Sequence, residues 1–300
     1  MRIAVTGSSG LISKDLLPHL AAGGHRITRL VRREARGADE ITWDPGTGDA
    51  SGIPVGALEG IDAVVHLAGA GVNDKRWSPA YKATIRDSRV LGTRTLVAAM
   101  TAMKQPPATL ISGSAVGYYG DRGDEELTER SPRGAGFLAD VVDAWEAEAL
   151  SAEVAGIRTV RLRTGLVMSD RGGAFGRLLS IFRTGAGGPL GDGRHWWPWI
   201  TMVDEVRAIE FCLTTPSLRG AVNAGSPSPQ RNADVSRALG RALHRPAVVA
   251  VPTVALRLTL GEFASDIVAS QRMLPTALLD AGFQFTHSDV DDACRWLVDD

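Results

Sequence analysis

The sequence predicts an α/β protein with a doubly wound, mostly parallel sheet and a smaller C-terminal lobe. Two observations support this fold class. The chain opens on a short apolar segment that is followed by glycines and a helical pattern, and further strand-length apolar segments then alternate with helix-length stretches. Strands that alternate with helices favour a parallel sheet covered on both faces. Ligands of such sheets bind at the carboxyl ends of the strands.

The first strand is expected over Arg2–Thr6, and a glycine turn follows it directly. A helix comes next, because apolar residues recur at every fourth position from Ile12. Gly7 permits a tight turn, Gly10 lets the backbone approach a pyrophosphate, and the helix N-terminus offers free N–H groups to the anion. The G-x-x-G-x-x-S spacing also fits an ordinary strand-to-helix turn, but its place after the first strand of a βαβ unit favours a dinucleotide. The residues expected at this ligand are Gly7, Ser8, Ser9, Gly10, Leu11 and Ile12.

The later elements follow the same alternation. Further strands are expected over His25–Val31, Asp62–Gly69, Ala108–Ser112, Ile157–Leu162 and Ala221–Ala224. Long helical stretches are expected over 79–103 and 136–154. From about Gly172 the pattern changes to a glycine-rich stretch with three tryptophans after it, and then to mixed helices and short strands.

Composition excludes several classes of partner. The 300 residues are 44% hydrophobic and 22% charged, with a net charge of -1, so no overall field attracts nucleic acid or an anionic membrane. Cys212 and Cys294 give neither metal-ligand spacing nor a disulfide framework, which predicts no metal site and a reducing compartment. Because the first predicted strand starts at residue 2, we expect no signal peptide. We also expect no membrane span, since the apolar run Val248–Leu260 is broken by Pro252 and Arg257. We expect a cytoplasmic protein.

The end of the second strand indicates which dinucleotide is bound. An acidic residue there binds the ribose hydroxyls of NAD, whereas an arginine accommodates the 2′-phosphate of NADP. The strand ends in Val31-Arg32-Arg33, so Arg32 favours NADP(H). A solvated pair of charges at a strand end is the plainer alternative, and Glu34, just beyond the strand, keeps NAD open. We expect residues 1–171, with 201–225 returning to them, to form the NADP-binding domain, and 172–200 with 226–300 to form the C-terminal lobe.

Several sequence strings resemble a known family. The chain resembles the extended branch of the short-chain dehydrogenases/reductases in three strings: TGSSGLIS, the strand end LAGAG, and SGSAVGYYGD. The chain is still more similar to an atypical group within this branch, the bacterial "epimerase family" proteins with their own C-terminal domain. The strings that resemble this group are NDKRW, SRVLGTR, GYYGDRGDE, GGPLGDGRHWWPWI, RNA and LPTALLDAGFQF. The resemblance implies a Rossmann domain for NADP(H) and a C-terminal substrate lobe, but no known substrate. The third glycine of the family turn is Ser13 here, and we expect binding to survive.

The resemblance implies a catalytic serine at Ser114, although this serine could instead only hydrogen-bond the strand end. The usual proton relay is missing. Members of the superfamily carry a Tyr-x-x-x-Lys pair on the next helix, where the tyrosine exchanges a proton and the lysine lowers its pKa. Here that helix reads FLADVVDAWE and contains neither residue. Three readings stay open: Tyr118 or Tyr119 supplies the acid, the hydride transfer needs no strong acid, or the protein binds its cofactor without turnover. Both tyrosines could instead pack beside the nicotinamide.

The remaining site residues also rest on the resemblance. The cofactor contacts it implies are Leu67, Ala68, Gly69, Arg163, Thr164, Gly165 and Leu166. The substrate contacts it implies are Asn73, Arg76, Trp77, Arg194, His195 and Trp196. The loop that carries the last three could instead be structural, with its tryptophans in the core. Asp204 resembles a structural acid. We therefore expect an NADP(H)-dependent oxidoreductase or epimerase-like enzyme on a small polar substrate, with a non-catalytic NADP(H)-binding module as the alternative. A homodimer through the two long helices is compatible with this resemblance.

Overall fold

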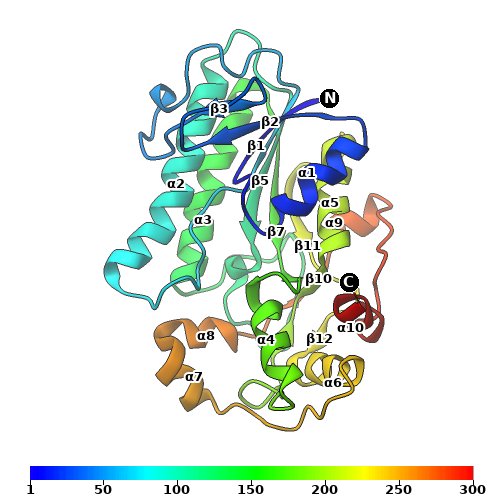
Figure 1. Ribbon diagram of the computed structural model, residues 1–300. Helices are drawn as coiled ribbons and strands as arrows, with labels where there is room; N and C mark the ends of the chain where they lie inside the picture. The colour runs from blue at the N-terminus through cyan, green and yellow to red at the C-terminus, as the bar shows by residue number, and fades with distance from the viewer. Residues whose placement is uncertain (300) are drawn as a thin grey trace. The chain divides into compact units, whose positions relative to one another are not determined.

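A seven-stranded sheet is the largest sheet in the computed structural model, which describes residues 1–299 (Figure 1). The strands lie in the order β11-β7-β5-β4-β1-β2-β3. Their bounds are β1 Arg2–Thr6, β2 Arg26–Val31, β3 Glu40–Thr42, β4 Ala63–His66, β5 Thr109–Ala115, β7 Arg158–Thr164 and β11 Gly220–Ala224. The pairs of β1 with β2 and β4, of β2 with β3, and of β4 with β5 are all parallel. The predicted doubly wound, mostly parallel fold is thereby confirmed.

Helices cover both faces of this sheet, which explains the continuous apolar strands. Every residue of β4 is buried, as expected for a strand covered on both faces. Figure 1 shows α2 (Pro79–Thr101) and α3 (Phe137–Leu150) together on one side, where Arg94 Nη2 lies 2.5 Å from Glu148 Oε1. On the other side, α1 (Ser13–Ala22) meets the later part of α5 (Met202–Thr214) through His19 and Glu210, whose Nε2 and Oε2 lie 2.8 Å apart.

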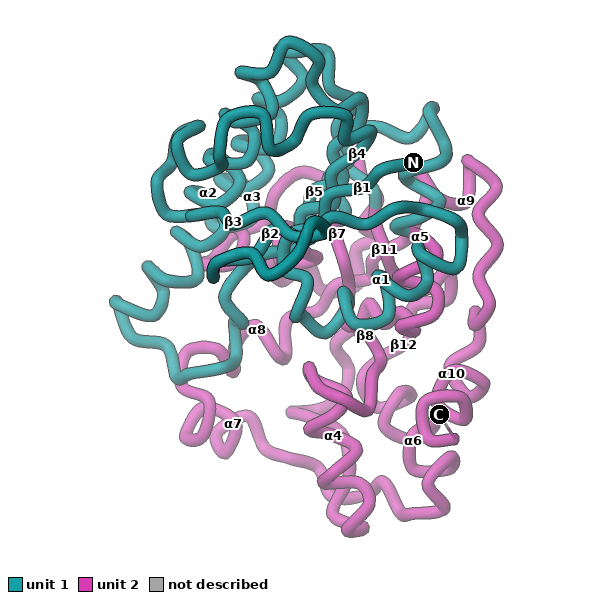
Figure 2. Tube along the Cα trace, turned by 45° about the horizontal axis from the view of Figure 1, so that its top comes forward, with its two compact units in different colours: residues 1–114, 140–162, 209–222 teal, residues 115–139, 163–208, 223–300 magenta. Residues whose placement is uncertain are grey.

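The chain divides into two compact units, coloured separately in Figure 2. Unit 1 comprises 1–114, 140–162 and 209–222, and unit 2 comprises 115–139, 163–208 and 223–300. This division differs from the domains expected from sequence, because residues 115–139, 163–171, 201–208 and 223–225 fall in unit 2 rather than with the cofactor domain. The units are also comparable in length, since these segments enlarge the second one.

Unit 2 has its own apolar core. It is built on α4 (Gly173–Arg183), α6 (Asn232–Ala242) and α10 (Val290–Asp299), with Phe175 and Trp199 both completely buried. Its remaining helices and turns are α7 Thr253–Leu260, η4 Gly261–Phe263, α8 Ala264–Ile267 and α9 Thr276–Asp280. Its short strands are β6 Glu126–Leu127, β8 Leu166–Met168, β9 Trp196–Trp197, β10 Trp199–Thr201, β12 Gln230–Arg231 and β13 Arg272–Met273.

Short 3-10 turns complete the architecture: η1 Ala50–Gly52, η2 Val116–Tyr119 and η3 Ser151–Ala155. Across residues 1–299, no helix is both long enough and apolar enough to span a membrane. Within the same residues, no cluster of histidine, cysteine and acidic side chains could hold a metal ion.

Candidate functional site

A cavity of about 800 Å³ in unit 1 lies at the carboxyl ends of β1, β2 and β4. A volume of this size suits a cofactor or a large metabolite. Eight of the residues predicted to contact the cofactor line it together: Gly7, Ser8, Ser9, Gly10, Arg32, Leu67, Ala68 and Gly69. The predicted turn and the predicted strand end therefore lie together at the carboxyl ends of the strands, where the topology predicts a ligand.

Close backbone packing explains why glycine opens the turn. Gly7 has a φ of 68°, and a Cβ there would lie 2.7 Å from the carbonyl carbon of Leu67. Any larger residue would therefore push apart the two strand ends that form the cavity wall. A Cβ at Gly10 would lie 3.0 Å from the Gly7 carbonyl oxygen, so the turn is closed on itself.

The helix that follows the turn has an N-terminus without a side-chain cap. Ile12 is the N-cap residue of α1, and no side chain accepts a hydrogen bond there. Such an end combines free N–H groups with the positive end of the helix dipole, which suits a phosphate. Ser13, at the position of the third family glycine, is buried and its Oγ has no hydrogen-bond partner. The turn, the uncapped helix and the cavity together fit the pyrophosphate of a dinucleotide.

Three arginines of β2 and its end line the cavity, but they are not equivalent. Arg33 donates to both carboxylate oxygens of Glu40, at 2.7 and 2.6 Å, and Arg29 lies 3.1 Å from the same carboxylate. The hydrogen bond from Arg33 holds the pKa of Glu40 at about 2, well below its usual value. Arg32 is exposed and makes no ion pair or hydrogen bond within the described residues. Arg32 is therefore the guanidinium that remains available to a ligand.

Ser114 lies at the end of β5 and is engaged with a buried carboxylate. Its hydroxyl donates to Glu146 Oε1 at 2.6 Å, and Arg161 Nη1 donates to Glu146 Oε2 at 2.8 Å. Ser114 and Glu146 are 5% and 3% exposed, so this bond is sheltered from water. Since the hydroxyl proton points toward Glu146, the serine oxygen can accept a hydrogen bond from a ligand.

Glu146 is a site residue that the sequence analysis missed. Positions 138 and 142 of α3 belong to its apolar stripe, and Glu146 continues that stripe at the next fourth position. An acid on a buried stripe is the signal that could have identified it.

In unit 2, Arg163 and two tyrosines form a buried cluster. Tyr119 is fully buried, donates its O–H to Asn223 Oδ1 at 2.7 Å and accepts from Arg163 Nη1 at 2.9 Å. Burial raises the pKa of Tyr119, which keeps its proton in place. Tyr118 is half-buried, with the Arg163 guanidinium 3.5 Å from its ring centroid, and its O–H makes no hydrogen bond in the described chain.

The other predicted cofactor residues of unit 2 run from the end of β7, at Thr164, to the start of β8. Thr164 Oγ1 donates to Glu205 Oε1 at 2.8 Å, and the Gly165 N–H donates to the Ala224 carbonyl at 2.8 Å. Leu166 begins β8. Burial raises the pKa of Glu205 to about 7, so this carboxyl is protonated well above its usual range.

The predicted substrate residues fall into two groups. Asn73, Arg76 and Trp77 lie in unit 1 between β4 and α2, where Trp77 Nε1 donates to the Val72 carbonyl at 2.8 Å. In unit 2, Arg194 and His195 line a separate hollow of about 440 Å³. Trp196 is held between Arg231 and Arg272, whose guanidinium carbons lie 4.6 and 4.7 Å from its ring centroid. Leu11 and Ile12 do not line the larger cavity: Leu11 lies in the turn before α1, and Ile12 is the N-cap residue of that helix.

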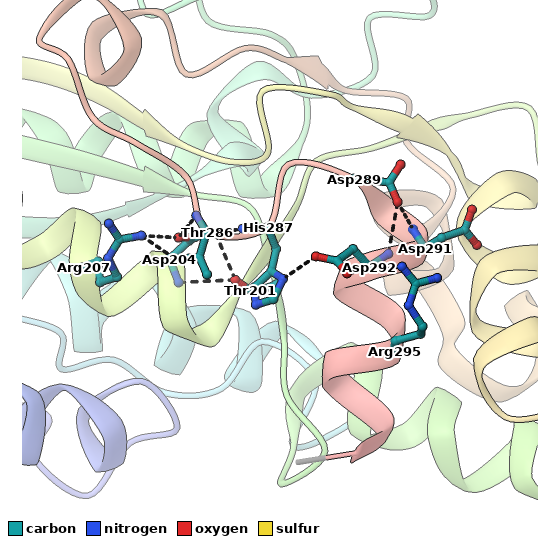
Figure 3. Close-up of polar contacts among 9 residues, drawn as sticks. All are labelled: Thr201, Asp204, Arg207, Thr286, His287, Asp289, Asp291, Asp292 and Arg295. Atoms are coloured by element: carbon teal, nitrogen blue, oxygen red, sulfur yellow. Dashed lines mark hydrogen bonds and ion pairs between the residues drawn. The ribbon is translucent and has the colours of Figure 1, made fainter.

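Asp204 has the structural role that its resemblance implied. It is fully buried, and its two carboxylate oxygens accept the backbone N–H groups of Thr286 and His287 at 2.8 and 2.9 Å. Arg207 Nη1 donates to the same carboxylate at 2.9 Å (Figure 3). Asp204 therefore fastens the segment before α10 to α5 within unit 2.

Comparison with known proteins agrees with this architecture. Residues 3–225 match the NAD dependent epimerase/dehydratase family, and residues 251–297 match a domain of unknown function called DUF1731. An epimerase family protein of Mycobacterium bovis is 42% identical over 99% of this chain and 97% of its own length. Epimerase family protein SDR39U1 of Bos taurus is 34% identical over 99% of this chain and 100% of its own.

A solved structure supports the same assignment. The human epimerase family protein SDR39U1, crystallised with NADPH, superimposes with a TM-score of 0.89 at 29% identity and covers 100% of this chain and 99% of its own. The resemblance seen in the glycine turn and in the strings along the chain is thus confirmed at the level of the family. The chain belongs to the NAD dependent epimerase/dehydratase family.

Proposed function

We propose that this protein binds NADP(H) in the cavity of unit 1 and acts as an oxidoreductase or epimerase-like enzyme on a small polar substrate. The observation that carries the cofactor assignment is the available guanidinium of Arg32, which lines the same cavity as the Gly7–Gly10 turn. The neighbouring Arg33 is neutralised by Glu40 and does not compete for the ligand. The NADPH in the crystals of the human relative supports the same choice.

Each half of the cofactor has matching groups in the chain. The turn and the N-terminus of α1 would hold the pyrophosphate, and Arg32 would hold the 2′-phosphate. The bound nicotinamide would supply or accept a hydride. Ser114 would accept a hydrogen bond from the substrate hydroxyl, because its own proton is directed to Glu146. Thr164, Gly165 and Leu166 are proposed as further contacts of the cofactor.

Tyr118 is the proposed acid where α3 offers no Tyr-x-x-x-Lys pair. Its O–H makes no hydrogen bond within residues 1–299, and the guanidinium of Arg163 lies against its ring. Tyr119 is proposed to position Arg163, because its own hydroxyl is buried and hydrogen-bonded. The substrate contacts proposed from the sequence, Asn73, Arg76, Trp77, Arg194, His195 and Trp196, stay proposals, as does a homodimer.

The second candidate is a non-catalytic NADP(H)-binding module located in the cytoplasm. The absence of tyrosine and lysine from α3 favours it, and so does the hydrogen bond that occupies the Ser114 proton. NADPH oxidation with a fractionated metabolite extract separates the two candidates. Oxidation that follows one fraction supports the enzyme, whereas tight NADPH binding without turnover in any fraction supports the module.

Substitution of the two neighbouring arginines tests the cofactor assignment. Arg32→Ala should weaken NADPH binding by roughly 1–3 kcal/mol, as expected for a charge-assisted contact, and should leave NADH binding nearly unchanged. Arg33→Ala is the matched control, because Arg33 is paired with Glu40, and it should alter the two affinities similarly. Fluorescence titration of both nucleotides measures these affinities. Equal losses for NADPH and NADH in Arg32→Ala would contradict the 2′-phosphate assignment.

A further inference from the structure

Arg89 of α2 is a cation packed against the wall of the cofactor cavity. Its Nη1 donates to the carbonyl of Ala70 at 2.9 Å and to that of Ile85 at 3.0 Å. A Cβ placed on Gly69 would lie 3.2 Å from the guanidinium carbon, so the group lies directly on the loop. Gly69 and Ala70 line the same cavity as the Gly7–Gly10 turn.

The other side of this guanidinium faces the helix that lacks the usual pair. The guanidinium carbon of Arg89 lies 5.3 Å from the ring centroid of Trp145 on α3. A Cβ on Gly113 would approach the same ring to 3.1 Å, and Gly113 immediately precedes Ser114. Within unit 1, Arg89 is thus linked to the loop of the cavity through Ala70 and to the catalytic strand end through Trp145.

No acidic group of the described chain compensates this charge. Arg89 forms no ion pair within residues 1–299, and burial lowers the pKa of its guanidinium to about 10. Its positive charge reaches His66, where burial first and Arg89 second lower the pKa to about 4. Burying a charge without a partner is costly, so such a site favours an anion supplied from outside the chain.

The donors needed for that anion are also present. The two bonds described above use Nη1 alone, and Nε and Nη2 make no hydrogen bond in the part of the chain that the structure describes. Neither atom is among the buried polar atoms that lack a partner, so each keeps some accessible surface. Two adjacent N–H donors on one guanidinium match the two oxygens of a phosphate.

We propose that Arg89 binds the cofactor half beyond the adenosine, donating Nε and Nη2 to oxygens of the pyrophosphate and the adjoining ribose. This inference rests on the proposed NADP(H) site. It supplies from α2 a cation that α3 does not carry. The two arginines then bind different parts of the cofactor. Arg32 binds the 2′-phosphate at the adenosine end, and Arg89 binds the half that approaches Ser114.

The affinities for the whole cofactor and for its adenosine fragment, measured on the same variants, test this assignment. NADPH and 2′,5′-ADP are titrated into wild type, Arg89→Met and Arg89→Lys by calorimetry, with folding checked by circular dichroism. The fragment carries the 2′-phosphate but lacks the second phosphate and the nicotinamide ribose. Arg86→Met is the matched control, because Arg86 lies one turn earlier on α2 and is exposed.

The Arg89 variants should lose affinity for NADPH but keep most of their affinity for 2′,5′-ADP. Arg89→Met should weaken NADPH about tenfold or more, as for loss of a charge-assisted contact, and 2′,5′-ADP less than about twofold. Arg89→Lys, which keeps the charge, should show the same selectivity with a smaller loss, and Arg86→Met should bind both ligands as wild type does. Equal losses for both ligands, or no loss for NADPH, would overturn the assignment of Arg89. Wild type that fails to bind NADPH would instead overturn the cofactor proposal.

Discussion

Glu205→Gln should remove a pH dependence of stability that the buried carboxyl imposes on unit 2. Glu205 is completely buried, accepts one hydrogen bond from Thr164 and has an Oε2 without a partner. Burial raises its pKa from 4.5 to about 7. The folded state therefore keeps a proton that the unfolded chain has already lost between these two pH values.

The magnitude follows from the two pKa values. A shift of about 2.5 units at roughly 1.4 kcal/mol per unit gives a loss of about 3 kcal/mol. Because the folded pKa is the higher one, this loss is absent below about pH 4.5, grows as the pH rises, and is complete above about pH 7. Glutamine at position 205 keeps a side-chain oxygen that can accept the hydrogen bond from Thr164, but it cannot ionise.

Urea unfolding of wild type and Glu205→Gln at pH 5, 6, 7 and 8 measures the effect. The free energy of unfolding of the variant relative to wild type should rise with pH by up to about 3 kcal/mol and then level off. Glu59→Gln is the control, because Glu59 is exposed, and it should show no such trend. A difference between Glu205→Gln and wild type that stays constant from pH 5 to 8 would refute the reasoning.

Two further predictions concern stability. Ser13→Ala should stabilise the protein by about 1 kcal/mol, because it removes a buried hydroxyl without a hydrogen-bond partner, and thermal unfolding measures the gain; a lower midpoint would contradict this account. Asp204→Ala should cost about 3–5 kcal/mol, because it removes a fully buried carboxylate and leaves the N–H groups of Thr286 and His287 without an acceptor. Chemical unfolding measures that cost, and Asp204→Asn, which keeps an acceptor oxygen, should lose less; equal losses in the two variants would argue against the hydrogen bonds as the cause.

Local patterns predicted the cofactor unit well. The strand over residues 2–6 has the bounds that were expected, and the glycine turn lies beside Leu67 because strand, turn and helix are contiguous in sequence. The edge strand Glu40–Thr42 was missed, since three residues carry too little periodicity. The helix α4 was missed as well, because glycines at its start masked its apolar face.

Long-range pairing explains what the sequence could not provide. The availability of Arg32 depends on Glu40 pairing with Arg33, and both arginines look alike in the sequence. The partner of Ser114 lies 32 residues away on a helix whose fourth-position spacing reads as apolar core. Arg89 stood within a recognised string, but its importance arises only from the loop and the ring that enclose it.

The chain passes several times between its two units, which limits how evolution could exchange one unit for another. The path changes unit after residues 114, 139, 162, 208 and 222, and each of these changes falls within a helix or strand, in the order β5, α3, β7, α5 and β11. No single recombination point separates the cofactor unit from the rest, and loss of residues 251–297 would remove both α10 and the anchor of Asp204. This path favours substitution within an intact chain, rather than exchange of modules, as the route to a new substrate preference. The relatives in Mycobacterium and Bos fit this expectation, because their similarity to this chain extends over 97% and 100% of their own lengths.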